Sequence, residues 1–318
     1  MKAIIYQKYG SPENLTLQEV NRPEPKADEV LVKVLAASLN QADGYMLSGT
    51  PFPLRFSAGL FRPKNQILGA DISGVIERVG KEVKQFQVGD EVFGDLSGSG
   101  FGGFAEYAVA KETTVAKKPK SLTFEEAAAM PMASVTALQG LRDLGQIKKG
   151  DEVLINGASG GVGSFAVQIA KAFGANVTAV CSRRNVELAK SLGADEVIDY
   201  AVRDFTKEGK KFDLILDGPV NHALNQIEAV LKDGGRYVAF GFSMATLLLG
   251  PWKSFRTGKK FANLIAKVKQ ADLESVATLA DKGKISPYIQ QNFMLDEVPQ
   301  AMNLLKNGKI SGKLSIII

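Results

Sequence analysis

Two cations and a hydroxyl occupy a position where charge could decide which ligand binds. Ser182, Arg183 and Arg184 follow the apolar run NVTAVC, which is typical of a β-strand. A hydroxyl beside two guanidinium groups suits a phosphate, because these donors make charge-assisted hydrogen bonds to phosphate oxygens. The sequence therefore predicts an anion site at the end of this strand. The alternative is that the arginines are only solvated, which applies mostly to Arg184 because its side chain could point away.

A glycine-rich turn precedes these residues by about 20 positions, the spacing found in dinucleotide-binding folds. The segment DEVLINGASGGVGSFAVQIAKAFG joins an apolar run to an amphipathic helical stretch through residues 157–163. A turn without bulky side chains, followed by helix N–H groups without partners, suits the pyrophosphate of a dinucleotide. The predicted contacts in this turn are Ala158, Ser159, Gly160, Gly161 and Val162.

The end of the second strand distinguishes the two nicotinamide dinucleotides. An Asp or Glu there would bind the 2′-hydroxyl of NAD and repel a 2′-phosphate. The chain has Ser182 and Arg183 instead. The sequence therefore predicts NADPH as the cofactor.

Residues that bind metals or form disulfides are scarce. The chain has one cysteine, Cys181, and one histidine, His222. One cysteine excludes an internal disulfide, and the two residues cannot supply the three or four nitrogen and sulfur ligands that zinc sites commonly use. We therefore expect no zinc, whereas an all-carboxylate magnesium site stays open. We expect Cys181 as a small buried strand residue and His222 as a surface or helix-capping residue.

Alternating strands and helices must position these residues. A helical stretch begins near Thr123, which has capping-box spacing with Glu126, and strands then alternate with helices up to Gly241. This order is typical of a doubly wound parallel sheet, the Rossmann architecture, so the predicted fold class is α/β. The regularity lapses through residues 244–260, and helical periodicity resumes from Phe261.

The first part of the chain has a different pattern. Residues 1 to about 120 contain short alternating apolar runs such as EVLVKVLAAS, separated by Pro and Gly clusters, which indicates a mostly β domain. The chain ends in the strand-like KLSIII, which could return to this domain. We therefore predict one domain over residues 1–121 with 286–318, and a dinucleotide-binding domain inserted at residues 122–285.

Composition narrows the function classes. The chain has 318 residues with 45% hydrophobic and 23% charged side chains, which is typical of a globular protein. Its net charge is +5, but the lysines are scattered, so we expect a solvated basic surface and no binding of nucleic acid. No window reaches the roughly 20 apolar residues of a membrane span, and the sequence predicts a cytoplasmic protein.

The motifs together resemble those of the medium-chain dehydrogenase/reductase family. They are MKAIIY, NRPEPKADEVLVKVLAASLNQAD, LGADISGVIERVGKEVKQFQVGDEVFG, GGFAEYAVA, AAAMPMASVTALQGL, INGASGGVG and SGKLSIII, and they cover nearly the whole chain. The resemblance is to the zinc-free quinone oxidoreductase branch that includes zeta-crystallin, near the chloroplast-envelope quinone oxidoreductase homologue subgroup. It implies that the mostly β part is a GroES-like domain.

The resemblance also implies a site and a reaction. Zinc-dependent relatives carry a cysteine and a histidine where this chain has Asn40 and Ala70. The reaction that the resemblance implies without these ligands is zinc-independent hydride transfer to a quinone or to the β-carbon of an α,β-unsaturated carbonyl compound. The resemblance places Asn40, Asp43, Tyr45 and Thr136 in a cleft between the domains. Asn40 could donate to a developing enolate or position the nicotinamide ribose, and Tyr45 could deliver the proton, unless water does.

Further contacts to the cofactor follow only from the resemblance. They are Tyr200 near the adenosine phosphate, Gly241 near the nicotinamide, and Lys313 in the closing SGK segment. The alternatives for Tyr200 and Lys313 are a packed aromatic and a surface cation. Relatives also suggest a homodimer. Another class of function stays open, that of an NADPH-binding regulatory or RNA-binding protein with little turnover.

Overall fold

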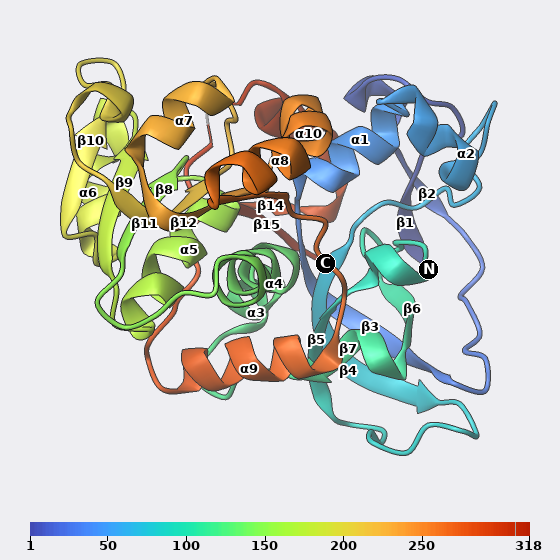
Figure 1. Cartoon of the computed structure of the whole chain (residues 1–318). Helices are drawn as coiled ribbons and strands as arrows, with labels where there is room; N and C mark the ends of the chain where they lie inside the picture. Colours follow the sequence, from blue (N-terminus) through green and yellow to red (C-terminus); the bar gives the residue numbers. More distant parts are fainter. Residues whose placement is uncertain (309) are drawn as a thin grey trace. The chain divides into compact units, whose positions relative to one another are not determined.

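The computed structural model describes residues 1–308 and 310–318, and these form two compact units. Unit 1 consists of Met1–Ala133 and Val268–Ile318, and unit 2 of Ser134–Lys267, so unit 2 is inserted into unit 1 along the chain (Figure 1). The units differ in extent from the predicted domains 1–121 with 286–318 and 122–285. Helices α3 (Phe124–Ala128) and α9 (Gln270–Asp281) belong to unit 1 because they pack against its strands.

Unit 2 is built on a parallel sheet of six strands. Their order is β10-β9-β8-β11-β12-β13, and every neighbouring pair is parallel. The strands are β8 (Glu152–Asn156), β9 (Asn176–Cys181), β10 (Glu196–Asp199), β11 (Phe212–Asp217), β12 (Leu231–Ala239) and β13 (Lys260–Asn263). The predicted Rossmann architecture is therefore confirmed. The carboxyl ends of these strands lie along one edge, where this fold binds nucleotides.

Helices connect the strands of this sheet. They are α4 (Pro131–Gln139), in which the chain passes from unit 1 to unit 2, α5 (Gly161–Ala172), α6 (Val186–Ser191), α7 (Leu224–Val230) and α8 (Met244–Thr257). Helix α5 shows why the sequence folds in this way, because the apolar side chains from Phe165 to Ile169 repeat at helical spacing and are buried.

Two predictions about the end of unit 2 are wrong. Residues 244–260, where regular structure was expected to lapse, contain the 14-residue helix α8 with Pro251 inside it. The segment from Phe261, expected as a helix, instead begins with β13, because Lys260–Asn263 pairs with β12 in parallel register. Helical structure resumes only at α9.

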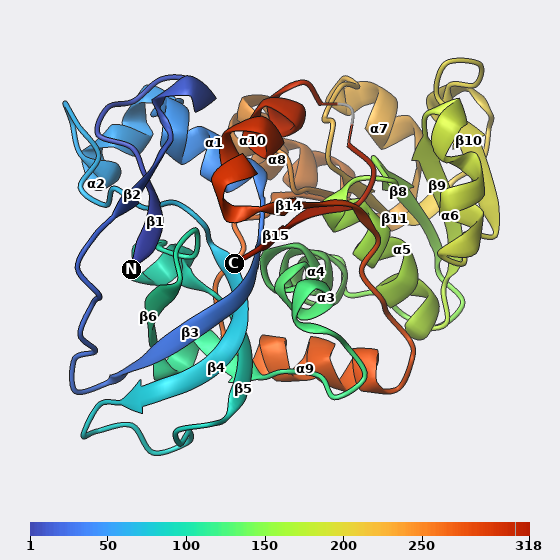
Figure 2. The ribbon, with the colours of Figure 1, turned by 180° about the vertical axis from the view of Figure 1, so that it is seen from behind.

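Unit 1 contains a seven-stranded sheet and a separate strand pair, β1 with β2. The sheet has the order β14-β15-β3-β4-β5-β7, and β6 also pairs with β3. The strands are β1 (Lys2–Ile5), β2 (Thr16–Glu19), β3 (Glu29–Ser38), β4 (Asp71–Val79), β5 (Glu91–Asp95), β6 (Tyr107–Lys111), β7 (Val115–Lys117), β14 (Ile289–Met294) and β15 (Lys313–Ile317). Figure 2 shows the dark red β15 beside β3, with which it pairs antiparallel. The predicted return of the last strand to the first domain is confirmed.

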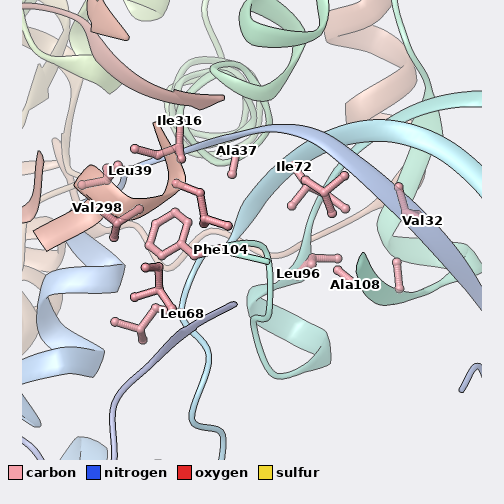
Figure 3. Packing of buried hydrophobic residues seen from close by; sticks show 14 of the residues in the cluster. Val32, Ala37, Leu39, Leu68, Ile72, Leu96, Phe104, Ala108, Val298 and Ile316 are labelled. Carbon is pink, nitrogen blue, oxygen red and sulfur yellow. The ribbon is translucent and has the colours of Figure 1, made fainter. Parts of the chain in front are cut away.

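The core of unit 1 lies around this sheet. Figure 3 shows the ring of Phe104 among the side chains of Leu39, Leu68 and Val298, all of them buried. Val298 belongs to α10 (Val298–Lys306), so residues from both ends of the chain share one core. This packing fixes the last strand beside the N-terminal segment of the unit.

Helices complete unit 1. They are α1 (Gln41–Ser48), α2 (Arg55–Ala58), α3, α9 and α10. The predicted capping box of α3 is present, because Thr123 Oγ1 accepts from the Glu126 N–H and Glu126 accepts from the Thr123 N–H. Among the described residues, no helix is both long and apolar enough to cross a membrane.

Candidate functional site

The first cluster of polar residues lies at the start of α1 in unit 1. Asn40 is the N-cap of this helix, and its N–H donates to Asp43 Oδ2 at 2.8 Å. The Gly69 N–H donates to Asp43 Oδ1 at 3.0 Å, so both carboxyl oxygens accept from the backbone. Burial raises the pKa of Asp43 to about 7, against the opposing effect of these two donors. Asp43 therefore ties α1 to the chain that enters β4.

A ring of three side chains joins the helix start to the last strand. Asn40 Nδ2 donates to Asp71 Oδ2 at 2.9 Å, and Lys313 Nζ donates to Asn40 Oδ1 at 2.5 Å. Lys313 Nζ lies 3.3 Å from Asp71 Oδ2 and also donates to the Leu39 carbonyl oxygen at 2.9 Å. All three side chains are buried. The ammonium group thus compensates a buried carboxylate and holds the Asn40 amide in one orientation.

Further acidic groups surround this ring. Asp71 accepts from Ser38 Oγ at 3.3 Å and from the Met132 N–H at 2.9 Å. Burial raises the pKa of Asp71, whereas Lys313 lowers it. Burial also raises the pKa of Asp95 to about 7, and the nearby charge of Asp71 adds to that shift. The cluster thus holds the carboxyls of Asp43, Asp71 and Asp95 around a single ammonium group.

The structure brings together some of the residues proposed for catalysis. Asn40, Asp43 and Lys313 lie in one network, although Lys313 was expected as a contact to the cofactor. Tyr45 lies further along α1 with 49% of its surface exposed, so its phenol is open to solvent. Sequence reasoning did not select Asp71 as a site residue. The only signal was an acid at the start of an otherwise apolar strand, ADISGVI.

The second candidate site is the turn between β8 and α5 in unit 2. Gly157 has a φ of 81°, which favours glycine, and α5 begins after Gly160. A Cβ on Gly163 would lie 2.1 Å from the Gly157 carbonyl oxygen, so only glycine lets the helix pack so closely on the turn. A Cβ on Gly160 would meet nothing closer than 3.5 Å. The bare backbone at this helix N-terminus fits a pyrophosphate.

The residues after β9 lie beside this turn. Asn185 Nδ2 lies 2.8 Å from Ser159 Oγ and 3.3 Å from Ser182 Oγ, so one amide connects the glycine turn to the serine that follows the strand. Arg183 and Arg184 are exposed, and within residues 1–308 and 310–318 neither forms an ion pair. These free guanidinium groups beside a hydroxyl fit a 2′-phosphate.

A buried carboxylate organises the middle of the strand edge. Asp217 ends β11, and its oxygens accept from Asn156 Nδ2 at 2.8 Å, Tyr237 Oη at 2.9 Å and the Val220 N–H at 3.1 Å. Burial raises the pKa of Asp217, and its hydrogen-bond donors oppose that effect. Val220 has a φ of 50°, which is strained for a β-branched residue. This network could not be predicted from local sequence patterns, because its members lie on three strands and a turn.

The other predicted residues occupy varied surroundings. The Tyr200 ring is exposed, and its N–H donates to the Cys181 carbonyl oxygen at 3.2 Å. Thr136 is half-buried on α4. A Cβ on Gly241 would lie 2.1 Å from the Gly218 carbonyl oxygen, so this glycine allows two turns at the strand edge to approach.

The two soft ligands of the chain serve structural roles. Cys181 is buried at the end of β9, as predicted, and burial raises its pKa to about 11. The His222 ring packs edge-on against Phe205, with 4.6 Å between centroids, just before α7 begins. Over the part of the chain that the structure describes, no three His, Cys, Asp or Glu side chains are grouped as metal ligands.

Two family descriptions match the chain. Residues 26–120 match the alcohol dehydrogenase GroES-like domain, and residues 192–316 match a family described as zinc-binding dehydrogenase. The first confirms the GroES-like domain expected from the sequence. The second covers the later strands of unit 2 and the C-terminal part of unit 1.

Known proteins resemble the chain over almost its whole length. It is 36% identical to the tomato (Solanum lycopersicum) 2-methylene-furan-3-one reductase, covering 99% of this chain and 79% of that protein. It is 35% identical to the mitochondrial NAD(P)H oxidoreductase RTN4IP1 of Mus musculus, covering 98% and 88%. The solved quinone oxidoreductase of Coxiella burnetii has a TM-score of 0.89 and 32% identity, covering 100% of this chain and 99% of that one.

Proposed function

The chain belongs to the medium-chain dehydrogenase/reductase family, in its quinone oxidoreductase-like branch, and from this we propose that it is an NADPH-dependent reductase of quinones or α,β-unsaturated carbonyl compounds. Its relatives are oxidoreductases, one of them named for NAD(P)H and another for an unsaturated furanone. When bound, the nicotinamide would supply hydride to the acceptor. The chain's own residues then have two tasks, holding the dinucleotide and stabilising charge on the acceptor.

The glycine turn supports the first task. The N–H groups at the start of α5 would bind the pyrophosphate, because the first N–H groups of a helix lack partners within it. Ala158, Ser159, Gly160, Gly161 and Val162 form this turn and the first residues of the helix. We assign Thr136, Tyr200, Gly241 and Lys313 further contacts only through the resemblance, and the burial of Lys313 in the Asn40 network favours a role within unit 1.

The observation that carries the choice of NADPH is the end of β9. No acid stands there, and Ser182 precedes two exposed guanidinium groups. A 2′-phosphate would accept charge-assisted hydrogen bonds from Ser182 and Arg183, which the 2′-hydroxyl of NADH cannot match. Hydrogen bonds to charged groups contribute roughly 1.5 to 3 kcal/mol each.

The second task falls to donors near α1. Negative charge grows on the acceptor oxygen as its carbonyl is reduced, and fixed donors stabilise it. One N–H of Asn40 Nδ2 donates to Asp71, and its second N–H is the donor that we propose for the acceptor oxygen. The exposed phenol of Tyr45 is the proposed proton source, with water as the other source. Asp43 supports this arrangement by fixing the backbone of Asn40.

The test is a comparison of NADPH and NADH with the unmutated protein and two variants. Fluorescence titration should show tighter binding of NADPH, and Arg183→Ala should reduce this preference by about tenfold or more, as expected for the loss of one charged hydrogen bond. Arg184→Ala is the matched control and should change it less. Equal affinity of the unmutated protein for the two cofactors would refute the proposal.

Turnover separates an enzyme from a binding module. NADPH oxidation with a panel of quinones and conjugated carbonyl compounds should be steady and should depend on the acceptor. Binding of NADPH without turnover of any acceptor would instead favour a regulatory or RNA-binding protein.

The proposed setting is a cytoplasmic homodimer. The lone, buried Cys181 suits a reducing compartment, because disulfides are rare there. The homodimer rests on the resemblance alone, and sedimentation velocity of the purified chain tests it.

A further inference from the structure

The turn after β11 lies between the two glycine segments that are proposed to hold the dinucleotide. It starts at Gly218, and β11 has β8 and β12 as its neighbours in the sheet (Figure 1). A Cβ on Gly157, in the turn after β8, would lie 3.0 Å from Pro219 Cδ. A Cβ on Gly241, after β12, would lie 2.1 Å from the Gly218 carbonyl oxygen and 3.1 Å from Val220 Cγ2. The turn therefore packs against the bare backbone of both segments.

Val220, the last residue of this turn, is held in a strained conformation. Its φ of 50° lies in the left-handed region, where the Cβ of an L-residue crowds the backbone. Of the non-glycine residues with a positive φ in the described part of the chain, it is the only β-branched one. Its N–H donates to Asp217 Oδ1 at 3.1 Å, and its side chain packs on the apolar core of unit 2. The carboxyl group and the core together keep Val220 in this conformation.

Asp217 can hold the turn because its own side chain is fixed by both neighbouring strands. The residue is fully buried, Oδ1 also accepts from Asn156 Nδ2 of β8 at 2.8 Å, and Oδ2 accepts from Tyr237 Oη of β12 at 2.9 Å. Among the described residues Asp217 forms no ion pair, so it does not compensate a buried cation. A buried carboxyl group without a cation is costly, which favours a role beyond stability.

We propose that Asp217 is a positioning residue for the nicotinamide half of the dinucleotide and that it acts through the turn on the Gly241 segment. This inference rests on the proposed function, in which Gly241 contacts the nicotinamide. Because Asp217 is fully buried, it acts through Val220 and not on the ligand directly. The adenosine half is assigned to Ser182 and Arg183 after β9, which does not neighbour β11, so the two halves can be tested separately.

Hydrogen exchange of the chain without nucleotide tests the contact between Asp217 and the turn. The Val220 N–H should exchange slowly in the unmutated protein and about tenfold or more faster in Asp217→Ala, as expected for the loss of one charged hydrogen bond. The N–H groups of β9 should stay protected. Asp213→Asn is the matched control, because Asp213 lies near the other end of β11 and accepts from the Glu152 N–H at 2.8 Å. It should leave the exchange of Val220 unchanged.

Binding of two ligands tests the effect on the nicotinamide half. Adenosine 2′,5′-bisphosphate has the 2′-phosphate but no nicotinamide, so the ratio of its Kd to that of NADPH measures what the nicotinamide half contributes. Asp217→Ala should lower this ratio by about fivefold or more, because Val220 would leave the left-handed region. The Kd of the bisphosphate should stay within about twofold of that of the unmutated protein.

Two further variants separate positioning from folding. Asp217→Asn keeps an oxygen that can accept from the Val220 N–H, so it should retain most of the ratio. Val220→Ala removes the γ-methyl group that packs on Gly241 and should lower the ratio. Val220 is only half-buried, so this variant should fold, and it decides the test alone if Asp217→Ala is too unstable to purify.

Three results would overturn the proposal. One is rapid exchange of the Val220 N–H in the unmutated chain. Another is an unchanged ratio in Asp217→Ala and Val220→Ala. A third is a parallel loss of affinity for both ligands, because Asp217 would then only stabilise unit 2. An unmutated chain that binds neither ligand would instead refute the proposed function, and this inference with it.

Discussion

The Asn40 side chain shows how a single residue is specified by its neighbours. Its Oδ1 accepts from Lys313, and one N–H of its Nδ2 donates to Asp71. A carboxylate and an ammonium group together dictate which end of the amide is oxygen and which is nitrogen. The remaining N–H of Asn40 is therefore presented in one direction, which suits a fixed donor to a substrate oxygen.

Replacing Lys313 should lower the free energy of unfolding. Lys313→Met would leave the buried Asp71 carboxyl without its ammonium partner, and breaking a buried pair in this way costs about 3 to 5 kcal/mol. Lys313→Met with Asp71→Asn should recover much of that loss. Urea unfolding of the two single variants and the double variant measures the coupling.

An exposed pair provides the control for this cycle. Lys171→Met removes a cation that contacts Asp195 at the surface of unit 2, and should cost about 1 kcal/mol or less. Additive effects of Lys313→Met and Asp71→Asn would contradict a direct interaction between the two buried groups.

The same cluster should make the protein less stable as the pH rises. The folded-state pKa of Asp95 is raised to about 7, above the value of about 3.9 in an unfolded chain, so the folded state holds its proton more tightly. Its contribution is fully present below about pH 4 and is lost as the pH rises to about 7, with a slope of about 1.4 kcal/mol per pH unit. Asp95→Asn should reduce this slope, and the part due to Asp43, whose pKa burial also raises to about 7, should remain.

A second carboxyl group, Asp195, has a lowered pKa and serves as the control. It distinguishes the effect of Asp95 on stability from a general effect of removing a carboxylate. Burial raises the pKa of Asp195, but Lys171 and the Val177 N–H together outweigh burial and lower this pKa below its usual value. Its stabilisation is present at higher pH and is lost only as the pH falls below about 4. Asp195→Asn should therefore leave the slope between pH 5 and 7 unchanged, and an equal flattening by both variants would contradict the assignment to Asp95.

At this scale candidate cofactor residues could be proposed from the sequence, whereas the partners of the buried polar residues could not. Ser182 and Arg183 could be selected because their distance from the glycine turn is fixed by one helix and one strand. The pairing of Asp71 with Lys313 could not, because it depends on the register of β15 and β4 on the two sides of β3. Local pattern contains no information on that register.

Helix α5 and its turn show how glycine positions an element. Gly163 lies inside the first helical turn, where its hydrogen faces the Gly157 carbonyl oxygen and the Ala158 Cα. The helix can therefore start directly on the strand that precedes it, and its N–H groups face the strand edge.

Two alanine substitutions should separate packing from ligand binding. Gly163→Ala would place a methyl group 2.1 Å from the Gly157 carbonyl oxygen, so it should destabilise the protein by about 1 to 3 kcal/mol or more. Gly160→Ala meets nothing closer than 3.5 Å and should keep the fold, but its methyl group should weaken nucleotide binding. Thermal unfolding and NADPH titration measure the two effects. A Gly163→Ala protein as stable as the unmutated one would contradict the packing argument.

Helices and strands could be predicted where the spacing of the apolar residues along the sequence matches the side chains that are buried in the fold. Helix α5, which follows the glycine turn, agrees with this rule, and the capping box of α3 was also predicted. Helix α8 does not, because Pro251 interrupts it and its apolar side chains face away from the sheet. β13 was not predicted because it has only four residues, which lie between the turn after α8 and the loop that follows.

The order in which the chain forms its two units determines which residues come into contact. Unit 1 is closed by β15, so Lys313 reaches Asn40 only because the chain returns after forming unit 2. The two soft ligands of the chain, Cys181 and His222, both belong to unit 2. Unit 1 therefore offers oxygen ligands alone at the positions where zinc-dependent relatives are expected to bind their metal.

The last prediction concerns metal and applies to the whole molecule. One matching family is described as zinc-binding, yet Asn40 and Ala70 stand where the resemblance places cysteine and histidine ligands. Burial raises the pKa of Cys181 to about 11, which keeps the thiol protonated and a poor metal ligand at neutral pH. NADPH-dependent turnover should therefore be unchanged after dialysis against a chelator, and metal analysis should find zinc well below one atom per chain. The opposite outcome is that the chelator abolishes activity, that added zinc restores it, and that about one zinc atom is bound per chain. This result would show that oxygen ligands of unit 1 are sufficient to bind zinc. Asn40 would then be assigned as a metal ligand instead of a hydrogen-bond donor.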